Sequence, residues 1–320
     1  MRRRTIVIAA LLASAPGAAQ TPLPRIGMLF PQAASGGRHP VEAELAALGY
    51  IEGRSAVFER RWADGRFERM PALAEELVRL RCDVIIASTT ASALALKRAT
   101  SSIPIVVLSS GDAVGSGLVE SLARPGGNVT GNSFLGPELA VKQIELVREL
   151  VPGIGRAAFV ANAAMPPEPI FFGQMQEAAS RSAIAIEFID TRRPEEFESS
   201  VSKVIASGAQ AAIFAPGGYS DRADDRARLL VATAGLRIPS LFFRREFVDS
   251  GGLISYGASF AVMNRQAAAY VDRILRGANP AGLPVLQPTV FELVINLGAA
   301  RRLGIGIPPL LLARADEVIE

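Results

Sequence analysis

The 320-residue chain has few of the side chains on which most enzyme active sites depend. His39 is its only histidine and Cys82 its only cysteine. A single histidine nearly excludes a histidine-rich metal centre and leaves one candidate for a catalytic triad. A single cysteine excludes an intramolecular disulfide. Because Cys82 comes just before an apolar strand-like run, we interpret it as a small buried hydrophobe.

Sequence motifs of nucleotide and acyl chemistry are also missing. No Walker A pattern occurs, and Gly115-Ser-Gly117 lacks the third glycine of a dinucleotide-binding loop. Gly131-Asn-Ser133-Phe-Leu135 breaks the nucleophile-elbow pattern at its last position. These absences favour a protein that binds its ligand without transforming it. They also lead us to expect no cofactor.

A net charge is missing from most of the chain. The formal charge of +3 is accounted for by Arg2, Arg3 and Arg4, which stand in a leading stretch without acidic residues. The remainder is therefore neutral overall. Because nucleic-acid binding depends on a positive field, we expect no nucleic-acid partner.

Residues 1–19 have the layout of a secretory signal peptide, with a charged start, an apolar run over Ile6–Ala13 and small residues before a cleavage site after Ala19. The apolar run is too short to span a bilayer, and we expect a protein that is not membrane-embedded. Cys82 lies too far from the cleavage site to be a lipidated first residue. An exported, unlipidated protein points to the periplasm.

The rest of the chain alternates strand-like and helix-like stretches. Met70, Leu73 and Leu77 follow helical spacing, whereas Asp83–Ala87 reads as a short buried strand. This alternation predicts parallel sheets with helices on both faces. Because the chain is longer than one core normally supports, we expect two doubly wound α/β domains that face each other across a cleft.

Three stretches are expected to cross between these domains, at Thr130–Phe134, Tyr256–Ala258 and Leu286–Thr289. They predict a first lobe of residues 20–132 plus 257–286. The second lobe is expected to comprise residues 133–256 plus 287–320.

The stretch after Ile103 is a candidate anion site. Its apolar run predicts a strand, Ser109–Asp112 form a polar turn, and Val114–Ala123 are expected to form a short helix. The first N–H groups of a helix lack internal partners and attract anions such as a carboxylate. The same loop also fits an ordinary helix cap, so the segment alone leaves both interpretations open.

Polar side chains follow the expected strands in both halves of the chain. Ligands of open parallel sheets bind beyond the carboxyl ends of the strands, so these side chains are candidates for one binding site. Each of them also fits a cap or a turn. The candidates are Ser88, Thr89, Thr90, Ser109, Ser110, Asp112, Asn162, Tyr219, Arg244 and Glu246.

A series of short motifs covers essentially the whole chain after residue 19. They are Tyr50-Ile-Glu-Gly-Arg54, Arg61-Trp-Ala-Asp-Gly-Arg66, Leu122-Ala-Arg-Pro-Gly-Gly-Asn-Val-Thr-Gly131, Arg245-Glu-Phe-Val-Asp-Ser-Gly-Gly252 with Ser255-Tyr-Gly257, Phe291-Glu-Leu-Val-Ile-Asn296 and Arg314-Ala-Asp-Glu-Val-Ile319. In this order they resemble the ABC transporter substrate-binding proteins typified by tryptophan- and tyrosine-binding lipoproteins.

The resemblance implies a type I periplasmic-binding fold with two Rossmann-like lobes joined by three crossover strands. It also implies a small-molecule ligand, amino-acid-like or a carboxylate, delivered to a cognate ABC permease and its ATPase. By position, Ser88–Ala91 and Ser109–Asp112 match loops that hold the ligand carboxylate, and Asn162 matches a loop residue of the second lobe. Glu246 matches an acidic position suited to a ligand ammonium.

The chain departs from this family pattern at Arg244 and Arg245, which stand where some members have acidic residues. Two arginines favour a ligand with more negative charge. Two other functions remain open from the sequence. One is a ligand-sensing subunit for a membrane receptor, and the other is an α/β enzyme that uses a carboxylate such as Asp112 or Glu246.

Overall fold

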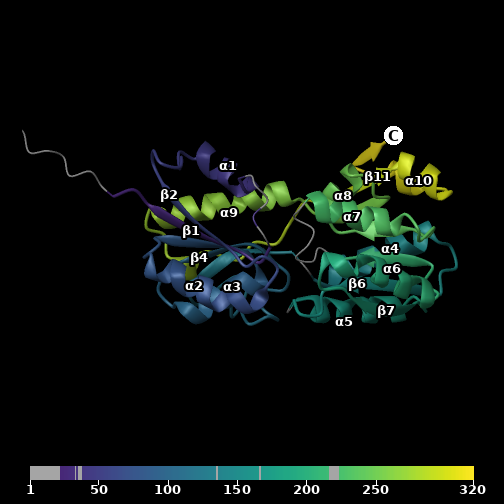
Figure 1. Ribbon diagram of the computed structural model, residues 1–320, viewed down its shortest axis with the longest axis horizontal. Helices are drawn as coiled ribbons and strands as arrows, with labels where there is room; N and C mark the ends of the chain where they lie inside the picture. Colours follow the sequence, from purple (N-terminus) through teal and green to yellow (C-terminus); the bar gives the residue numbers. More distant parts are fainter. Residues whose placement is uncertain (1–21, 33, 35–37, 135, 166, 216–222) are drawn as a thin grey trace, which may run out of the picture.

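The computed structural model describes residues 22–32, 34, 38–134, 136–165, 167–215 and 223–320. The expected signal peptide and Tyr219 lie outside these described residues. The chain forms two lobes, each built around its own sheet (Figure 1).

The first sheet has five parallel strands in the order β2-β1-β3-β4-β5. Apolar runs form these strands because helices cover both faces of the sheet. We call the part of the chain packed around this sheet the first lobe. Its strands are β1 (Arg25–Phe30), β2 (Val57–Trp62), β3 (Val84–Thr89), β4 (Ile105–Ser110) and β5 (Val129–Ser133).

Two pairs of helices cover the two faces of the first sheet. The α2 helix (Met70–Arg79) and the α3 helix (Thr90–Ala99) pack on one face. The α1 helix (Pro40–Ala47) and the α9 helix (Phe260–Leu275) pack on the other, so a late segment of the chain completes the first lobe. Histidine here is structural, because the Nδ1 atom of His39 accepts a hydrogen bond from Val41 N and caps α1.

The second sheet has the order β12-β11-β10-β9-β8-β6-β7, and only its β10–β11 pair is antiparallel among the described strands. The part of the chain packed around it is the second lobe. Its strands are β6 (Arg156–Ala161), β7 (Ala185–Asp190), β8 (Ala211–Phe214), β9 (Ser240–Phe242), β10 (Ile254–Ala258), β11 (Phe291–Asn296) and β12 (Glu317–Ile319).

The helices of the second lobe divide between the two faces of its sheet. The larger apolar cluster includes α4 (Pro137–Leu150), α5 (Pro167–Ser180), α10 (Leu297–Leu303) and α11 (Pro309–Ala313). The smaller cluster includes α6 (Phe197–Ala206), α7 (Ala223–Thr233) and α8 (Arg245–Asp249). Short 3₁₀ turns occur at Phe67–Arg69, Pro194–Glu196 and Pro280–Gly282.

The chain passes between the lobes three times: after β5, between β10 and α9, and between Leu286 and β11. The crossings lie side by side. Ser133 N donates to Leu286 O at 2.9 Å, and Leu286 N donates to Gly131 O at 2.8 Å. Ser259 N donates to Val290 O at 3.2 Å and joins the second crossing to the third. The expected fold class, two doubly wound α/β lobes joined by three crossovers, is thereby confirmed.

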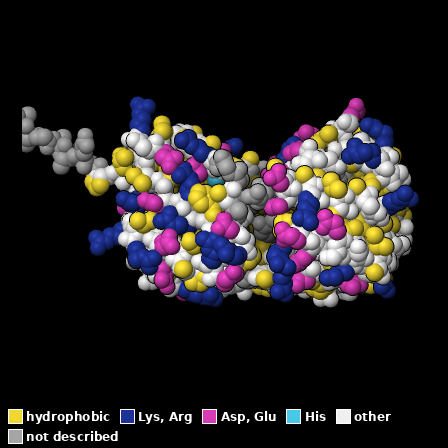
Figure 2. Space-filling model, in the orientation of Figure 1, with side chains coloured by type: hydrophobic (Ala, Val, Ile, Leu, Met, Phe, Trp, Pro, Cys, Tyr) yellow, Lys and Arg dark blue, Asp and Glu magenta, His cyan; other side chains and the backbone are white. Residues whose placement is uncertain are grey.

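The crossings also orient the two sheets. The β5 strand runs into the first crossing at its carboxyl end, and β10 runs into the second. The parallel neighbours of each strand end at the same edge. The carboxyl-terminal edges of both sheets therefore face the space between the lobes, where Figure 2 shows the surface to be hollowed.

The helix expected over Val114–Ala123 is absent, and this expectation was wrong. Leu118 N and Val119 N both donate to Ala113 O, and Gly117 has a φ of +72°. The chain therefore reverses at Gly117, in the left-handed region that favours glycine. This turn places Leu118 and Val119 in the apolar core of the first lobe.

We expect Gly257→Ala to destabilise the protein. A Cβ atom at Gly257 would lie 1.9 Å from the carbonyl oxygen of Phe243, so neighbouring backbone would have to move. Overpacking of this kind costs about 1–3 kcal/mol of unfolding free energy. Thermal unfolding measures the change. Gly282→Ala is the matched control, since nothing lies within 4 Å of its Cβ position. Equal unfolding midpoints for both variants would contradict the expectation.

Candidate ligand-binding site

The carboxyl-terminal edge of the first sheet gathers five of the candidate residues. Strand β3 ends at Thr89 and strand β4 at Ser110, and the register pairs Thr89 with Ser109. Thr89 is also the N-cap of α3, with its Oγ1 accepting from Ser92 N. The structure thus brings the candidates at the ends of β3 and β4 together: Ser88, Thr89, Thr90, Ser109 and Ser110.

Hydroxyl groups hold this edge in shape. Ser109 Oγ donates to Ser88 O at 2.9 Å, and Thr90 Oγ1 accepts from Gly111 N at 3.0 Å. Thr90 Oγ1 and Ser110 Oγ lie 3.4 Å apart. The hydroxyls of Ser109 and Thr90 are therefore engaged by the protein itself.

The Ser88 hydroxyl differs from its neighbours. Ser88 is 5% exposed, and its Oγ has no hydrogen-bond partner among the described residues. It stands next to the N-terminus of α3, whose first N–H groups have no acceptor within the helix. The carboxyl end of β3 thus offers two kinds of hydrogen-bond donor to an anion, a hydroxyl and the first N–H groups of a helix.

Asp112 lies at the same edge but in a different role from the one expected. Its Oδ1 accepts from Val114 N at 3.1 Å and from Gly115 N at 2.8 Å. The carboxylate of Asp112 thus occupies the N–H groups that the sequence offered to a ligand. Since no helix follows, Ser109–Asp112 do not stand at a helix N-terminus, whereas α3 supplies such an end nearby.

Aromatic rings stand beside this polar group. Phe30 and Trp62 end the adjacent strands β1 and β2, and their rings stack with centroids 5.8 Å apart. Trp62 is partly exposed. The first-lobe edge therefore offers an apolar surface close to a group of hydrogen-bond donors.

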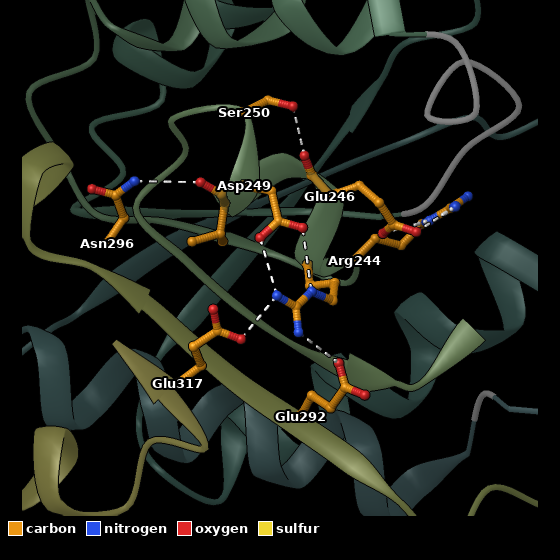
Figure 3. Close-up of polar contacts among 9 residues, drawn as sticks. Arg244, Glu246, Asp249, Ser250, Glu292, Asn296 and Glu317 are labelled. Carbon is orange, nitrogen blue, oxygen red and sulfur yellow. Dashed lines mark hydrogen bonds and ion pairs between the residues drawn. The ribbon is translucent and has the colours of Figure 1, made fainter. Parts of the chain in front are cut away.

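In the second lobe, Arg244 and Glu246 form a pair (Figure 3). Arg244 Nη2 donates to Glu246 Oε1 at 3.0 Å, and Arg244 Nε donates to Oε2 at 3.3 Å. The guanidinium also lies 4.3 Å from the ring centroid of Phe260. Burial acts to raise the pKa of Glu246, but the charge and hydrogen bonds of Arg244 outweigh it and hold that pKa below its usual value.

Arg245 has several carboxylate partners. Its guanidinium bonds Asp249 at 3.2 Å and Glu317 at 2.9 Å, and Glu292 lies 3.7 Å away (Figure 3). These contacts tie α8 to β11 and β12. The charges of Arg244 and Arg245 are therefore balanced within the second lobe, which removes the reason to expect a more negative ligand.

Asn162 lies in the loop between β6 and α5 and is 1% exposed. Its Oδ1 accepts from Ala164 N at 2.9 Å, and its carbonyl oxygen accepts from Met165 N. Met165 O in turn accepts from Glu168 N at 3.1 Å. Asn162 thus shapes the loop that starts α5 at the edge facing the first lobe.

Glu168, in the first turn of α5, was not among the sequence candidates. It is 1% exposed, and its Oε2 has no partner among the described residues. Burial raises the pKa of its carboxyl group to about 8. A signal was available in the sequence, because Glu168 has helical spacing to the buried Phe171 and Met175 and so falls on an apolar face.

A cavity of about 310 Å³ lies beside Glu246 at the second crossing. Its wall includes Phe243, Arg245, Ser259, Phe260 and Glu292. This volume lies at the lower end of the range for small-molecule sites, which is about 300–1,000 Å³.

The described part of the chain contains no cluster of three or more histidine, cysteine, aspartate or glutamate side chains that could hold a metal ion. Within the same residues, no helix has the length and apolar character needed to cross a membrane.

Comparison with known proteins assigns the family. The family model described as ABC transporter substrate binding protein matches residues 34–319. The chain belongs to this family. Its members bind small-molecule ligands, work with a permease and typically act outside the cytoplasm.

Individual proteins are similar to this chain in sequence or in structure. The chain is 25% identical over 255 residues to a tyrosine-binding protein of Clostridioides difficile, covering 79% of this chain and 72% of the relative. A conserved domain protein of Vibrio cholerae has a similar structure, with 27% identity, a TM-score of 0.83 and coverage of 92% and 99% of the two chains. An ABC domain of Streptococcus pneumoniae in complex with L-Trp shares the fold at 23% identity, with a TM-score of 0.83 and coverage of 93% and 100%.

We expect Glu168→Gln to change how stability depends on pH. The folded-state pKa of Glu168 is raised from 4.5 to about 8, so between these values the folded protein binds a proton that the unfolded chain releases. The stability of the native protein therefore falls as pH rises through this window, by roughly 1.4 kcal/mol per pH unit at most. Glutamine does not ionise and removes this loss.

Thermal unfolding at pH 5 and pH 8 checks this expectation. The unfolding midpoints of the native protein and of Glu168→Gln should lie closer together at pH 5. At pH 8 the midpoint of the variant should have risen relative to that of the native protein. A constant difference at both pH values would contradict the raised pKa.

Proposed function

We propose that this substrate-binding protein is the periplasmic receptor of an ABC uptake transporter. Its ligand is a small amino-acid-like molecule or carboxylate, held in the cleft between the lobes. The receptor delivers this ligand to its permease, which the associated ATPase drives. It performs no catalysis. Residues 1–19 direct its export, and no lipid anchors it.

The main support for a ligand with a carboxylate is the buried hydroxyl of Ser88, which has no partner among the described residues. A buried hydroxyl without a partner costs folding free energy unless something else binds it. Here it lies beside the N-terminus of α3 at the edge that faces the other lobe. A ligand carboxylate would accept hydrogen bonds from both, and the stacked rings of Phe30 and Trp62 would cover an apolar part of the ligand.

Closure of the lobes by hinge bending completes the proposal. The moving units are residues 20–132 with 257–286 and residues 133–256 with 287–320. Support comes from the three crossings, which are single chain segments joined to one another by a few backbone hydrogen bonds. Because Phe260 begins α9 directly after the second crossing and contacts Arg244, closure would also move the Arg244–Glu246 pair.

A thermal-shift screen of amino acids and small carboxylic acids tests the proposed function. A ligand at a hundred times its Kd stabilises the folded protein by about 2.7 kcal/mol, which gives a clear rise in the unfolding midpoint. If no such compound raises the midpoint, the proposed ligand class is wrong.

We expect Ser88→Ala to weaken binding of a ligand found in this screen by about tenfold, because the carboxylate loses one hydrogen-bond donor. Isothermal titration calorimetry measures this change. Ser202→Ala is the control, since the Ser202 hydroxyl is bonded to Glu198 O on an exposed helix face. Equal affinities for the Ser88 and Ser202 variants would place the carboxylate elsewhere.

A further inference from the structure

We propose that Glu168 is the ligand-contacting carboxylate of the second lobe, and that it binds a protonated amine of the ligand. This inference rests on the proposed function, because it requires a ligand in the cleft between the lobes. It replaces the role that the sequence gave to Glu246.

The state of the Glu168 side chain is the first argument. It is 1% exposed, and its Oε2 accepts no hydrogen bond from any described residue. Burial accounts for its raised pKa, so no cation among the described residues stands close enough to offset the effect. A buried carboxyl group without a partner is costly to fold, which indicates that its partner comes from outside the chain.

The position of Glu168 is the second argument. It lies in the first turn of α5, directly after the loop that leaves the carboxyl end of β6. Strands β9, β8 and β6 are parallel neighbours, so their carboxyl ends share one edge of the second sheet. Glu168 therefore belongs to the edge that faces the first lobe. The start of a helix also favours the ionised form of a carboxylate when a cation is present.

The other carboxylates that the structure describes along this edge have partners. Glu246 is bonded through both oxygens to Arg244. Asp190, at the end of β7, accepts from Ala163 N and from Arg192 Nε. Among the buried carboxylates of the described residues, only Glu168 has an oxygen without a partner.

A protonated amine suits Glu168 better than a neutral donor or a metal ion. A hydroxyl would supply a hydrogen bond but not the missing opposite charge. A metal ion would need further ligands, and the described residues hold no cluster of three or more that could provide them. An ammonium group supplies both the hydrogen bond and the charge.

The two lobes then carry complementary functions. In the first lobe, Ser88 and the N-terminus of α3 present donors to an anion. In the second lobe, Glu168 presents an acceptor to a cation. A ligand with both groups would bond to both lobes and so stabilise the closed arrangement, since it gains the second bond only on closure.

Binding measurements with matched ligands test this inference. The probes are the standard amino acids and, for each one that binds, the des-amino acid with the same side chain and carboxylate. For tyrosine and tryptophan these are 3-(4-hydroxyphenyl)propionic acid and indole-3-propionic acid. Thermal shift identifies the binders, and calorimetry gives Kd for the native protein, Glu168→Gln and Glu177→Gln. Glu177 is the control because it lies on the same helix, exposed and paired with Arg181.

In the native protein, we expect an amino acid to bind about tenfold to a hundredfold more tightly than its des-amino partner. Glu168→Gln should abolish most of this difference by weakening the amino acid alone, and Glu177→Gln should leave it intact. The unfolding midpoint of each variant without ligand shows whether it is folded. If Glu168→Gln does not fold, Glu168→Asp, which keeps the charge on a shorter side chain, should still prefer the amino acid.

Four results would overturn the inference. If des-amino acids bind as tightly as amino acids, or if Glu168→Gln keeps the full preference for the amino acid, Glu168 does not bind the ligand amine. The proposed function stands in both cases. If Glu246→Gln rather than Glu168→Gln removes the preference, the original assignment to Glu246 is correct. If neither class of compound binds at all, the proposed ligand class fails together with the inference.

Discussion

The side-by-side course of the three crossings is the constraint on which the rest of the molecule depends. Backbone hydrogen bonds from Ser133 to Leu286, from Leu286 to Gly131 and from Ser259 to Val290 hold these segments together. Because β5 and β10 run into the crossings at their carboxyl ends, both sheets turn the same edge toward the space between the lobes. Residues far apart in sequence, such as Ser88 at the end of β3 and Glu168 at the start of α5, thereby belong to the edges of the two sheets that face each other.

The polar groups at these edges differ in whether they have hydrogen-bond partners within the protein. Asp112 is satisfied by Val114 N and Gly115 N, and Arg244 is bonded to Glu246. Ser88 Oγ and Glu168 Oε2 are buried and have no partner among the described residues. A buried polar atom without a hydrogen-bond partner indicates a binding site better than a polar residue as such does, because leaving that atom unpaired lowers the stability of the fold.

Much of the fold could be predicted from the sequence, because strand and helix periodicity is a local property. The strand expected at Asp83–Ala87 is observed as β3 over Val84–Thr89, and the helix expected from Met70 begins at that residue. The helix over Val114–Ala123 was wrong because Gly117 and the burial of Leu118 favour a reversed turn. Of the candidate site, the ends of β3 and β4 were located from sequence, whereas Glu168 was missed because its burial depends on α5 packing against the second sheet.

The sequence by itself determined the fold class, the alternation of strands and helices, and the family, because each of these depends on local patterns and motifs along the chain. Only the tertiary structure decided which polar side chains are already paired. Arg244, Arg245 and Glu246 have the same charges in the sequence whether they are free or bonded. Their partners are set by how α8, β11 and β12 pack, so the charge that a ligand would meet is a property of the folded arrangement.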